Sequence, residues 1–216
     1  MEKLKIKITE ESLRKAELID SQIEHSSMHL HYHFIWDLIS DMDMDIVTYL
    51  EIGSYGGGSA SLASSHFKKT RCFSVDFGCG EYINHTIPNV EKFKNPDSTY
   101  HLIVGNSHSI EIIQETKEKI GGSIDILFID GDHSFNGALN DFINYSPILS
   151  PGGYVIFDDY LDWRYSPEVK HAVDHIVNDI IGDSYEIIGT PDDEFKARVS
   201  YSLPGGKNNC FVIRKK

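Results

Sequence analysis

The sequence DIVTYLEIGSYGGGSASLASSHF, residues 45–67, sets a pattern that the rest of the chain repeats. It begins with a β-branched, apolar run that Gly53 closes, which predicts a buried strand. The glycines after Gly53 predict a tight turn, and the small and apolar residues that follow predict a helix. A strand that leads through a glycine turn into a helix is typical of folds built on a parallel sheet.

The same order of strand and helix recurs to the C-terminus. Further strands are predicted at residues 70–76, 99–107, 124–133, 153–160, 184–191 and 208–216. Helices are predicted over much of residues 1–45 and at residues 109–120, 136–149 and 166–181. We expect residues 150–153 to stop a helix, Ser166 to cap the next one, and Pro167 to occupy its first turn. The last two strands lack an intervening helix, so we expect an antiparallel edge there.

Composition narrows the classes of partner. The chain has 216 residues, and its net charge of −13 comes without a cluster of basic residues. Nucleic acids and anionic membranes both require a basic face, so we expect neither as a partner. Three cysteines without metal spacing, and an N-terminus unlike a signal peptide, indicate a reduced, cytoplasmic protein. No apolar run approaches membrane-spanning length.

The predicted strands all end in glycine, polar or acidic residues. These ends are Glu51 to Gly53, Asp76, Asn106-Ser107, Asp130 to His133, and Asp158-Asp159. In a parallel sheet the carboxyl ends of the strands lie on one rim, where ligands bind. Buried charges are costly unless they are paired or bound to a metal. We therefore expect a cation, a substrate or a solvated acidic rim there.

The glycine turn excludes two common nucleotide sites. Tyr55 occupies the third position from Gly53, so the dinucleotide fingerprint fails, and no Lys follows the glycines as in a phosphate-binding loop. The pattern Gly53-x-Tyr55-x-Gly57-x-Ser59 instead resembles the first motif of class I S-adenosylmethionine-dependent methyltransferases, in the form found in metal-dependent catechol and caffeoyl-CoA O-methyltransferases. A plain glycine-rich turn is the alternative reading.

The resemblance extends from about residue 49 to 160, and residues 128–160 and 166–177 are also similar to bacterial sugar O-methyltransferases. It implies a Rossmann-like, doubly wound sheet with helices on both faces. We expect one domain over residues 1–216, with residues 1–45 as a helical cap or lid and residues 46–216 as the core. It also implies that S-adenosylmethionine lies over the glycine turn, with its ribose on Asp76. The expected cofactor contacts are Glu51, Gly53, Ser54, Tyr55, Gly57, Ser59, Asp76, Asn106, Ser107, His108 and Asp130.

A divalent cation is implied in the same way. Asp130, Asp158 and Asp159 match the positions of its ligands, although catechol-type relatives carry Asp-Asn where this chain has Asp158-Asp159. Oxygen ligands favour Mg²⁺, with Mn²⁺ or Ca²⁺ as alternatives. His133 follows Asp130 by three residues, where the sugar-modifying relatives hold a histidine base, so Asp130 and His133 are the expected catalytic pair. A helix-capping or hydrogen-bonding role is the alternative for His133.

The acceptor is expected to be a hydroxyl of a sugar or nucleotide sugar, contacted by Trp163 and Arg164. A catechol or other phenol is one alternative, and a cofactor-binding protein without transfer activity is another. Residues 78–96 are interpreted as a long, lid-like loop. The alternating His29, His31 and His33 are interpreted as a surface or lid-facing set. The chain is a candidate homodimer or higher homo-oligomer.

Overall fold

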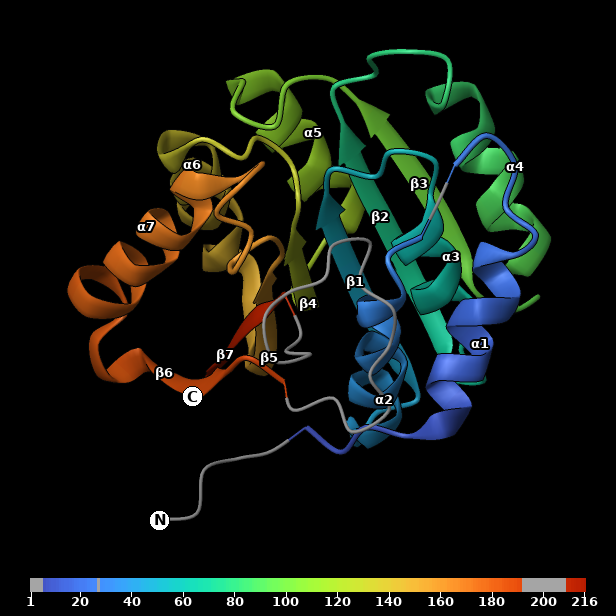
Figure 1. Cartoon of the computed structure of the whole chain (residues 1–216), viewed down its shortest axis with the longest axis horizontal. Coiled ribbons are helices and arrows are strands. Elements are labelled where there is room, and N and C mark those ends of the chain that lie inside the picture. The colour runs from blue at the N-terminus through green and yellow to red at the C-terminus, as the bar shows by residue number, and fades with distance from the viewer. Residues whose placement is uncertain (1–5, 27, 192–208) are drawn as a thin grey trace.

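The computed structural model describes residues 6–26, 28–191 and 209–216, which form a layered α/β fold (Figure 1). The strands are β1 (Ile46–Ile52), β2 (Lys69–Asp76), β3 (Thr99–Val104), β4 (Ile124–Ile129), β5 (Leu149–Phe157), β6 (Tyr185–Gly189) and β7 (Phe211–Lys215). They form a sheet in the order β3-β2-β1-β4-β5-β7-β6. Strands β1 to β5 pair in parallel, whereas β7 runs antiparallel to β5 and β6. The expected mostly parallel sheet with an antiparallel C-terminal edge is confirmed.

Helices cover both faces of this sheet (Figure 1). The α-helices are α1 (Glu10–Asp20), α2 (Phe34–Asp41), α3 (Gly58–Ser64), α4 (Ile83–Phe93), α5 (Ile110–Ile120), α6 (Phe135–Tyr145) and α7 (Pro167–His175). The shorter helical segments are η1 (Leu30–His33), η2 (Ser146–Ile148), the π-helical η3 (Ile176–Ile180) and η4 (Gly182–Ser184). Helices α1 to α4 pack on one face and α5 to α7 on the other. None of the helices in the described ranges is long and apolar enough to cross a membrane.

Central strand β1 shows why the sheet needs both layers. Val47 and Tyr49 pack into the core beneath α1, α2 and α3, whereas Leu50 and Ile52 pack into the core beneath α5 and α6. Side chains alternate between the two faces of a strand, so an apolar run of this length is stable only when helices cover both faces.

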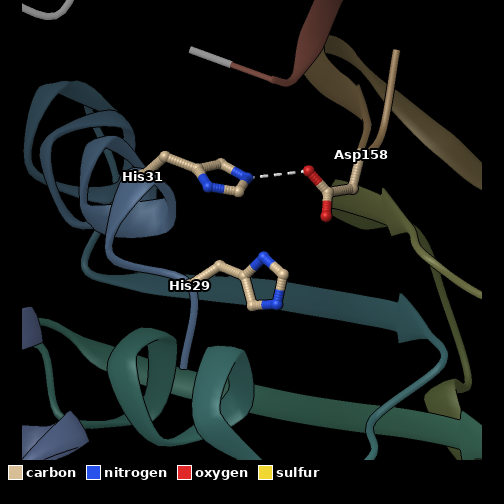
Figure 2. Close-up of side chains that lie close together, drawn as sticks. All are labelled: His29, His31 and Asp158. Atoms are coloured by element: carbon tan, nitrogen blue, oxygen red, sulfur yellow. Dashed lines mark hydrogen bonds and ion pairs between the residues drawn. The ribbon is translucent and has the colours of Figure 1, made fainter. Parts of the chain in front are cut away.

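The N-terminal segment is helical, as predicted, and folds back against the sheet. Asp37 of α2 is buried and joins it to α1, since its carboxylate accepts hydrogen bonds from the hydroxyls of Thr9 and Ser12, each at 2.6 Å. Thr9 also caps α1 by accepting the N–H of Ser12. This junction supports η1, from which the side chains of His31 and Tyr32 reach Asp158, directly after β5; Figure 2 shows the contact of His31.

Three local predictions are wrong. Residues 83–93 form helix α4 instead of continuing a long loop, because Thr86, Asn89 and Val90 give this segment one buried face. Residues 150–153 lie within β5. The pairing of β5 with β4 shifts in register between Ile124 and Ile126 of β4, and this irregularity accommodates a proline in β5. Ser166 precedes α7, but its hydroxyl does not cap the helix, because it binds the acidic rim instead.

Candidate active site

A pocket of about 820 Å³ opens over the carboxyl ends of β1, β2, β4 and β5. That volume is sufficient for a cofactor-sized molecule. The predicted site residues that line it are Gly53, Ser54, Tyr55, Ser59, Asp76, Asn106, Ser107, His108, Asp130, His133, Asp158 and Asp159. Glu51, Gly57, Trp163 and Arg164 were also predicted, but they do not line it. The strand ends therefore meet at one rim.

The glycine turn brings β1 and β4 close together. Gly53 has a φ of +88°, and a Cβ at this position would lie 2.0 Å from the carbonyl oxygen of Asp130. Gly57, with a φ of +82°, is the N-cap residue of α3. Only glycine adopts such angles readily, and only glycine leaves room for the neighbouring strand. The turn thus forms the floor of the pocket.

Asp76 holds this turn from the end of β2. Its Oδ2 accepts the backbone N–H groups of Ser54 and Tyr55, both at 2.9 Å, and its Oδ1 accepts that of Gly78 at 2.8 Å. A carboxylate offers about four lone-pair sites, so roughly one remains for another donor. The side chain lines the pocket and is 7% exposed.

Glu51 lies behind the turn. It is fully buried and accepts hydrogen bonds from the hydroxyls of Ser59, Ser74 and Tyr49 at 2.6, 2.7 and 3.1 Å. Burial raises the pKa of Glu51 above its usual value. Hydrogen bonds from these hydroxyls favour the charged form and reduce this shift. The structure gives Glu51 a role in joining β1, β2 and α3.

The residues that follow β3 form a polar wall of the pocket. Ser107 donates its hydroxyl to Asp141 Oδ1 at 2.7 Å, and His108 Nε2 lies 3.1 Å from the same oxygen. The neighbouring Asp141 carboxylate raises the pKa of His108. Asn106 accepts the backbone N–H of His108 at 2.9 Å. These contacts fix the loop that carries Asn106 to His108 against α6.

The acidic rim, formed by Asp130, Asp158 and Asp159, adjoins the glycine turn and is closed by Tyr32. The Tyr32 hydroxyl donates to Asp158 Oδ2 at 2.5 Å and lies 3.1 Å from Asp130 Oδ2. Burial and the charge of Asp158 raise the pKa of Asp130 to about 7. Burial also disfavours the charged form of Asp158, but His31 and Tyr32 outweigh it and hold the pKa of Asp158 below its usual value. Asp158 therefore keeps its charge more readily than Asp130.

Asp159 faces the opposite way from Asp158. Its φ of +56° is unusual for a residue other than glycine and turns the chain immediately after β5. Its carboxylate accepts the Ser166 hydroxyl at 2.6 Å and the side-chain amide of Asn209 at 2.9 Å. Burial and the neighbouring Asp158 raise the pKa of Asp159.

His133 bridges the rim. Its Nε2 lies 3.4 Å from Asp130 Oδ1, and its Nδ1 lies 3.4 Å from Asp159 Oδ2 and 2.9 Å from the Ser166 hydroxyl. The hydrogen bond to Asp130, together with the charges of the three rim carboxylates, raises the pKa of His133 to about 9 despite partial burial. With no cation beside these carboxylates, the ring is an imidazolium near neutral pH.

The acidic rim separates into two groups of potential metal ligands. In the described part of the chain, ligand atoms of Asp130, His133 and Asp159 lie within 4.8 Å of one another, and so do those of His29, His31 and Asp158. Carboxylate oxygens and imidazole nitrogens both suit divalent ions. The first group therefore fits a cation, with His133 as a further donor beside two of the three expected carboxylates.

The interpretation of the histidine set requires correction, whereas the acceptor contacts expected at Trp163 and Arg164 stay a prediction. His31 and His33 are buried, so the interpretation as a surface set is wrong for them. Trp163 is 75% exposed, and Arg164 stacks on the Tyr165 ring at 5.1 Å. From the same loop, Asp162, Tyr165 and Ser166 line the pocket instead.

Several further residues line the pocket beside the predicted site residues. Tyr32 packs edge-on against Phe128, with ring centroids 5.1 Å apart, which brings its hydroxyl to the rim. Met28, His29 and Tyr82 also line the pocket. The alternating histidines and the tyrosine of residues 29–33 were a detectable signal, but their distance from the strand ends in the sequence concealed their role.

Comparisons with known proteins agree with this architecture. A family model described as a methyltransferase domain matches residues 50–160. An uncharacterized protein, R132, of Acanthamoeba polyphaga mimivirus is 35% identical over 209 residues, which cover 93% of this chain and 94% of that protein.

Solved structures resemble the chain in fold. The O-methyltransferase of Bacillus cereus, solved in complex with SAH, has a TM-score of 0.66 at 14% identity and covers 97% of this chain and 92% of its own. The O-methyltransferase TomG of Streptomyces achromogenes, in complex with SAM, scores 0.62 at 13% identity, with coverage of 98% and 92%. MycE, a methyltransferase of mycinamycin biosynthesis solved with Mg, SAH and mycinamycin VI, scores 0.62 at 16% identity, with coverage of 94% of this chain and 54% of MycE. These likenesses confirm the expected Rossmann-like fold.

Proposed function

The chain belongs to the methyltransferase-domain family, and we propose that it transfers a methyl group from S-adenosylmethionine to a hydroxyl oxygen with the help of a divalent cation. The observation that carries this proposal is the pocket of about 820 Å³. One side of it is formed by the glycine turn and Asp76, and the other by Asp130, His133 and Asp159. Two reactants that lie in one pocket meet in a fixed orientation, which lowers the entropic part of the barrier.

The cofactor would lie over residues 53–59. Asp76 would accept a ribose hydroxyl with the lone-pair site that its three backbone hydrogen bonds leave. Asn106, Ser107 and His108 would border the adenine, since they line the pocket on the side of β3. In this arrangement, the methyl group of the cofactor would lie on the side of the pocket that Asp130 and His133 line.

Asp130 and Asp159 would hold the cation. When bound, a divalent ion makes a coordinated hydroxyl more acidic, and its charge opposes the carboxylate field that keeps His133 protonated. We expect Mg²⁺, with Mn²⁺ or Ca²⁺ as alternatives, because oxygen atoms dominate this ligand set.

His133 would accept the proton of the acceptor hydroxyl. Ser166 contacts Nδ1 at 2.9 Å and orients the ring, so Nε2, on the side of Asp130, is the nitrogen that we assign to the proton. The proton leaves the hydroxyl as its oxygen attacks the methyl carbon and the sulfur departs with its electron pair. His133 acts as a base only when its ring is neutral. A neutral ring requires a positive charge, such as that of the cation, to offset the negative charge of the rim carboxylates.

The acceptor that fits this rim is a sugar or sugar-bearing metabolite. Five carboxylates, those of Asp130, Asp132, Asp158, Asp159 and Asp162, line this side of the pocket and offer acceptors to a molecule with several hydroxyls. A phenol would depend more on apolar walls, of which Tyr32 and Tyr165 are the nearest examples.

The test is a transfer assay with labelled S-adenosylmethionine and a panel of sugars, nucleotide sugars and catechols. We expect labelled sugar ethers with Mg²⁺ or Mn²⁺, and loss of turnover with a chelator. Full turnover in excess chelator would remove the cation from the mechanism, and labelled catechol alone would replace the sugar by a phenol. Cofactor binding without any transfer across the panel would favour a non-catalytic binding protein.

The His133→Ala variant tests the base. General-base catalysis contributes roughly 10²–10⁴-fold, so kcat should fall by about that factor while calorimetry shows nearly unchanged cofactor affinity. His171→Ala, which alters an exposed histidine on α7, serves as the matched control and should retain the native rate. A native rate in His133→Ala would assign the proton to another group.

A further inference from the structure

His29, His31 and Asp158 form a second group of ligand-type side chains on the far side of Asp158 from His133. One nitrogen from each imidazole and one oxygen from the carboxylate all lie within 4.8 Å of one another. Figure 2 shows both histidine rings, from the chain segment at η1, on the side that faces Asp158 at the end of β5. The methyl-transfer mechanism proposed above gives no role to either histidine.

The surrounding contacts orient this group. Tyr32 donates to Oδ2 of Asp158 at 2.5 Å, so Oδ1 is the oxygen that points to His31 Nε2, at 2.9 Å. His31 is 1% exposed and Asp158 is 3% exposed, so packing restricts both side chains. Hydrogen bonds that orient a ligating carboxylate are a usual feature of metal sites.

The pocket gives access to the group. His29 and Asp158 line the pocket, whereas His31 lies behind them. An ion among the three side chains would be reached from the pocket, and its free coordination position would face the same space. Three protein ligands with one open position are typical of reactive metal sites, whereas structural sites are closed by four protein ligands.

We propose that His29, His31 and Asp158 bind a transition-metal ion of the Zn²⁺ type, at a site separate from the oxygen-rich group of Asp130 and Asp159. Two imidazoles and one carboxylate suit Zn²⁺, Co²⁺, Ni²⁺ or Fe²⁺, whereas Mg²⁺ prefers an all-oxygen shell. The negative charge of Asp158 and the adjoining carboxylates offsets the charge of the ion.

The required rearrangement is small. Zn–N and Zn–O bonds of about 2.0–2.2 Å in a tetrahedral shell place a nitrogen and an oxygen ligand about 3.3 Å apart. His31 Nε2 and Asp158 Oδ1 are 2.9 Å apart, so they need to separate by only about 0.4 Å. His29 is the least buried of the three and supplies most of the adjustment, by rotation of its side chain. The bound ion would link the N-terminal segment to β5.

Co²⁺ titration of the metal-free full-length protein, without cofactor or acceptor, tests the site. With excess Mg²⁺ present to occupy the oxygen-rich group, we expect one Co²⁺ to bind with a visible absorption band typical of nitrogen ligation at low coordination number, and Zn²⁺ to abolish the band. His29→Ala and His31→Gln should each weaken Co²⁺ binding by about tenfold or more. His29 is partly exposed, so His29→Ala decides the question if His31→Gln does not fold.

Two controls separate this site from its neighbours. His25→Ala removes a histidine that stacks on His85, with ring centroids 4.0 Å apart, and should keep the band. Asp130→Asn alters the other ligand group and should also keep it. Absence of a band in the native protein, a native band in His29→Ala, or its loss in His25→Ala or Asp130→Asn would overturn the proposal. Because no methyl donor is present, none of these outcomes depends on the proposed methyl transfer.

Discussion

Asp76 connects the end of β2 to the glycine turn after β1, on the cofactor side of the pocket. It lies at the end of β2 and accepts three backbone N–H groups, two of which belong to the glycine turn after β1. One side chain therefore shapes the turn and presents a carboxylate to the pocket.

Asp76→Ala should weaken binding of S-adenosylhomocysteine. A hydrogen bond to a charged group contributes about 1.5–3 kcal/mol, so the loss of the ribose contact alone corresponds to at least a tenfold change, and the loosened turn adds to it. Isothermal titration calorimetry measures the effect. Asp97→Asn, which alters an exposed acid beyond α4, should bind as the native protein does. Equal affinity in Asp76→Ala would refute the assignment of the ribose to Asp76.

His66 is buried away from the pocket and is neutral in the folded protein. Its Nδ1 accepts the backbone N–H of Lys68 at 3.0 Å, and its Nε2 contacts the Ser40 hydroxyl at 2.7 Å. Burial, and then the charge of Lys68, lower the pKa of His66 from 6.5 to about 4. The folded state thus binds this proton more weakly than the unfolded state does.

The contribution of His66 to stability should depend on pH in a defined direction. The stabilisation from neutral His66 is fully present above pH 6.5. It declines as pH falls from 6.5 to about 4, and the free energy of unfolding falls by roughly 2–4 kcal/mol over this interval. His66→Gln cannot take up the proton, so it should lose less stability over this interval. Urea unfolding at pH 7.5 and 4.5 measures the difference, and parallel losses in both proteins would contradict the prediction.

At the scale of elements, the approach of β1 to β4 depends on Gly53. Strand β1 ends in a left-handed turn that places Gly53 against the backbone of Asp130. The glycine turn and the acidic rim are therefore adjacent because two neighbouring strands end at the same height.

Gly53→Ala should destabilise the protein and reduce cofactor affinity. The added Cβ would lie 2.0 Å from the Asp130 carbonyl oxygen at a φ of +88°, so the strand ends must separate, at a cost of more than about 2 kcal/mol. Gly122→Ala is the matched control, since no atom lies within 4 Å of its added Cβ, and should change the free energy of unfolding by less than about 0.5 kcal/mol. Thermal unfolding compares the two, and similar small effects would show that the strands do not meet at Gly53.

At the scale of the whole molecule, the acidic rim combines side chains from both ends of the chain. Tyr32 and His31 reach Asp158 from the N-terminal segment, across 126 and 127 residues of sequence. Asn209, just before β7, holds Asp159 at 2.9 Å and accepts the backbone N–H groups of Tyr160 and Leu161.

Asn209→Ala should therefore reduce both stability and cation affinity. Its loss leaves the part-buried N–H of Leu161 without this acceptor, which costs about 1 kcal/mol, and frees Asp159 to rotate. Loss of an orienting partner typically weakens metal binding by about 10–100-fold. Thermal unfolding and Mn²⁺ titration measure the two effects, with the exposed Asn140→Ala on α6 as control. Native Mn²⁺ affinity in Asn209→Ala would show that Asp159 does not depend on this contact.

Much of the fold and half of the site follow from local sequence patterns. Apolar runs of strand length, glycine after β1, and polar residues at each strand end predict a parallel sheet with its ligands at one rim, because every parallel strand ends at the same edge. These patterns were sufficient to identify Asp76, Asp130, His133 and the Asp158-Asp159 pair as neighbours.

Only the tertiary structure decided which partner each of these side chains has. Asp158 and Asp159 are adjacent in the sequence, yet the positive φ of Asp159 sends them toward different groups, with His31 and Tyr32 on one side and Asn209 on the other. Periodicity reports which face of a strand or helix is buried, but it contains no information about which distant segment covers that face. That choice is made by packing of α1, α2 and β7 against the sheet, which brings both ends of the chain to the carboxylates.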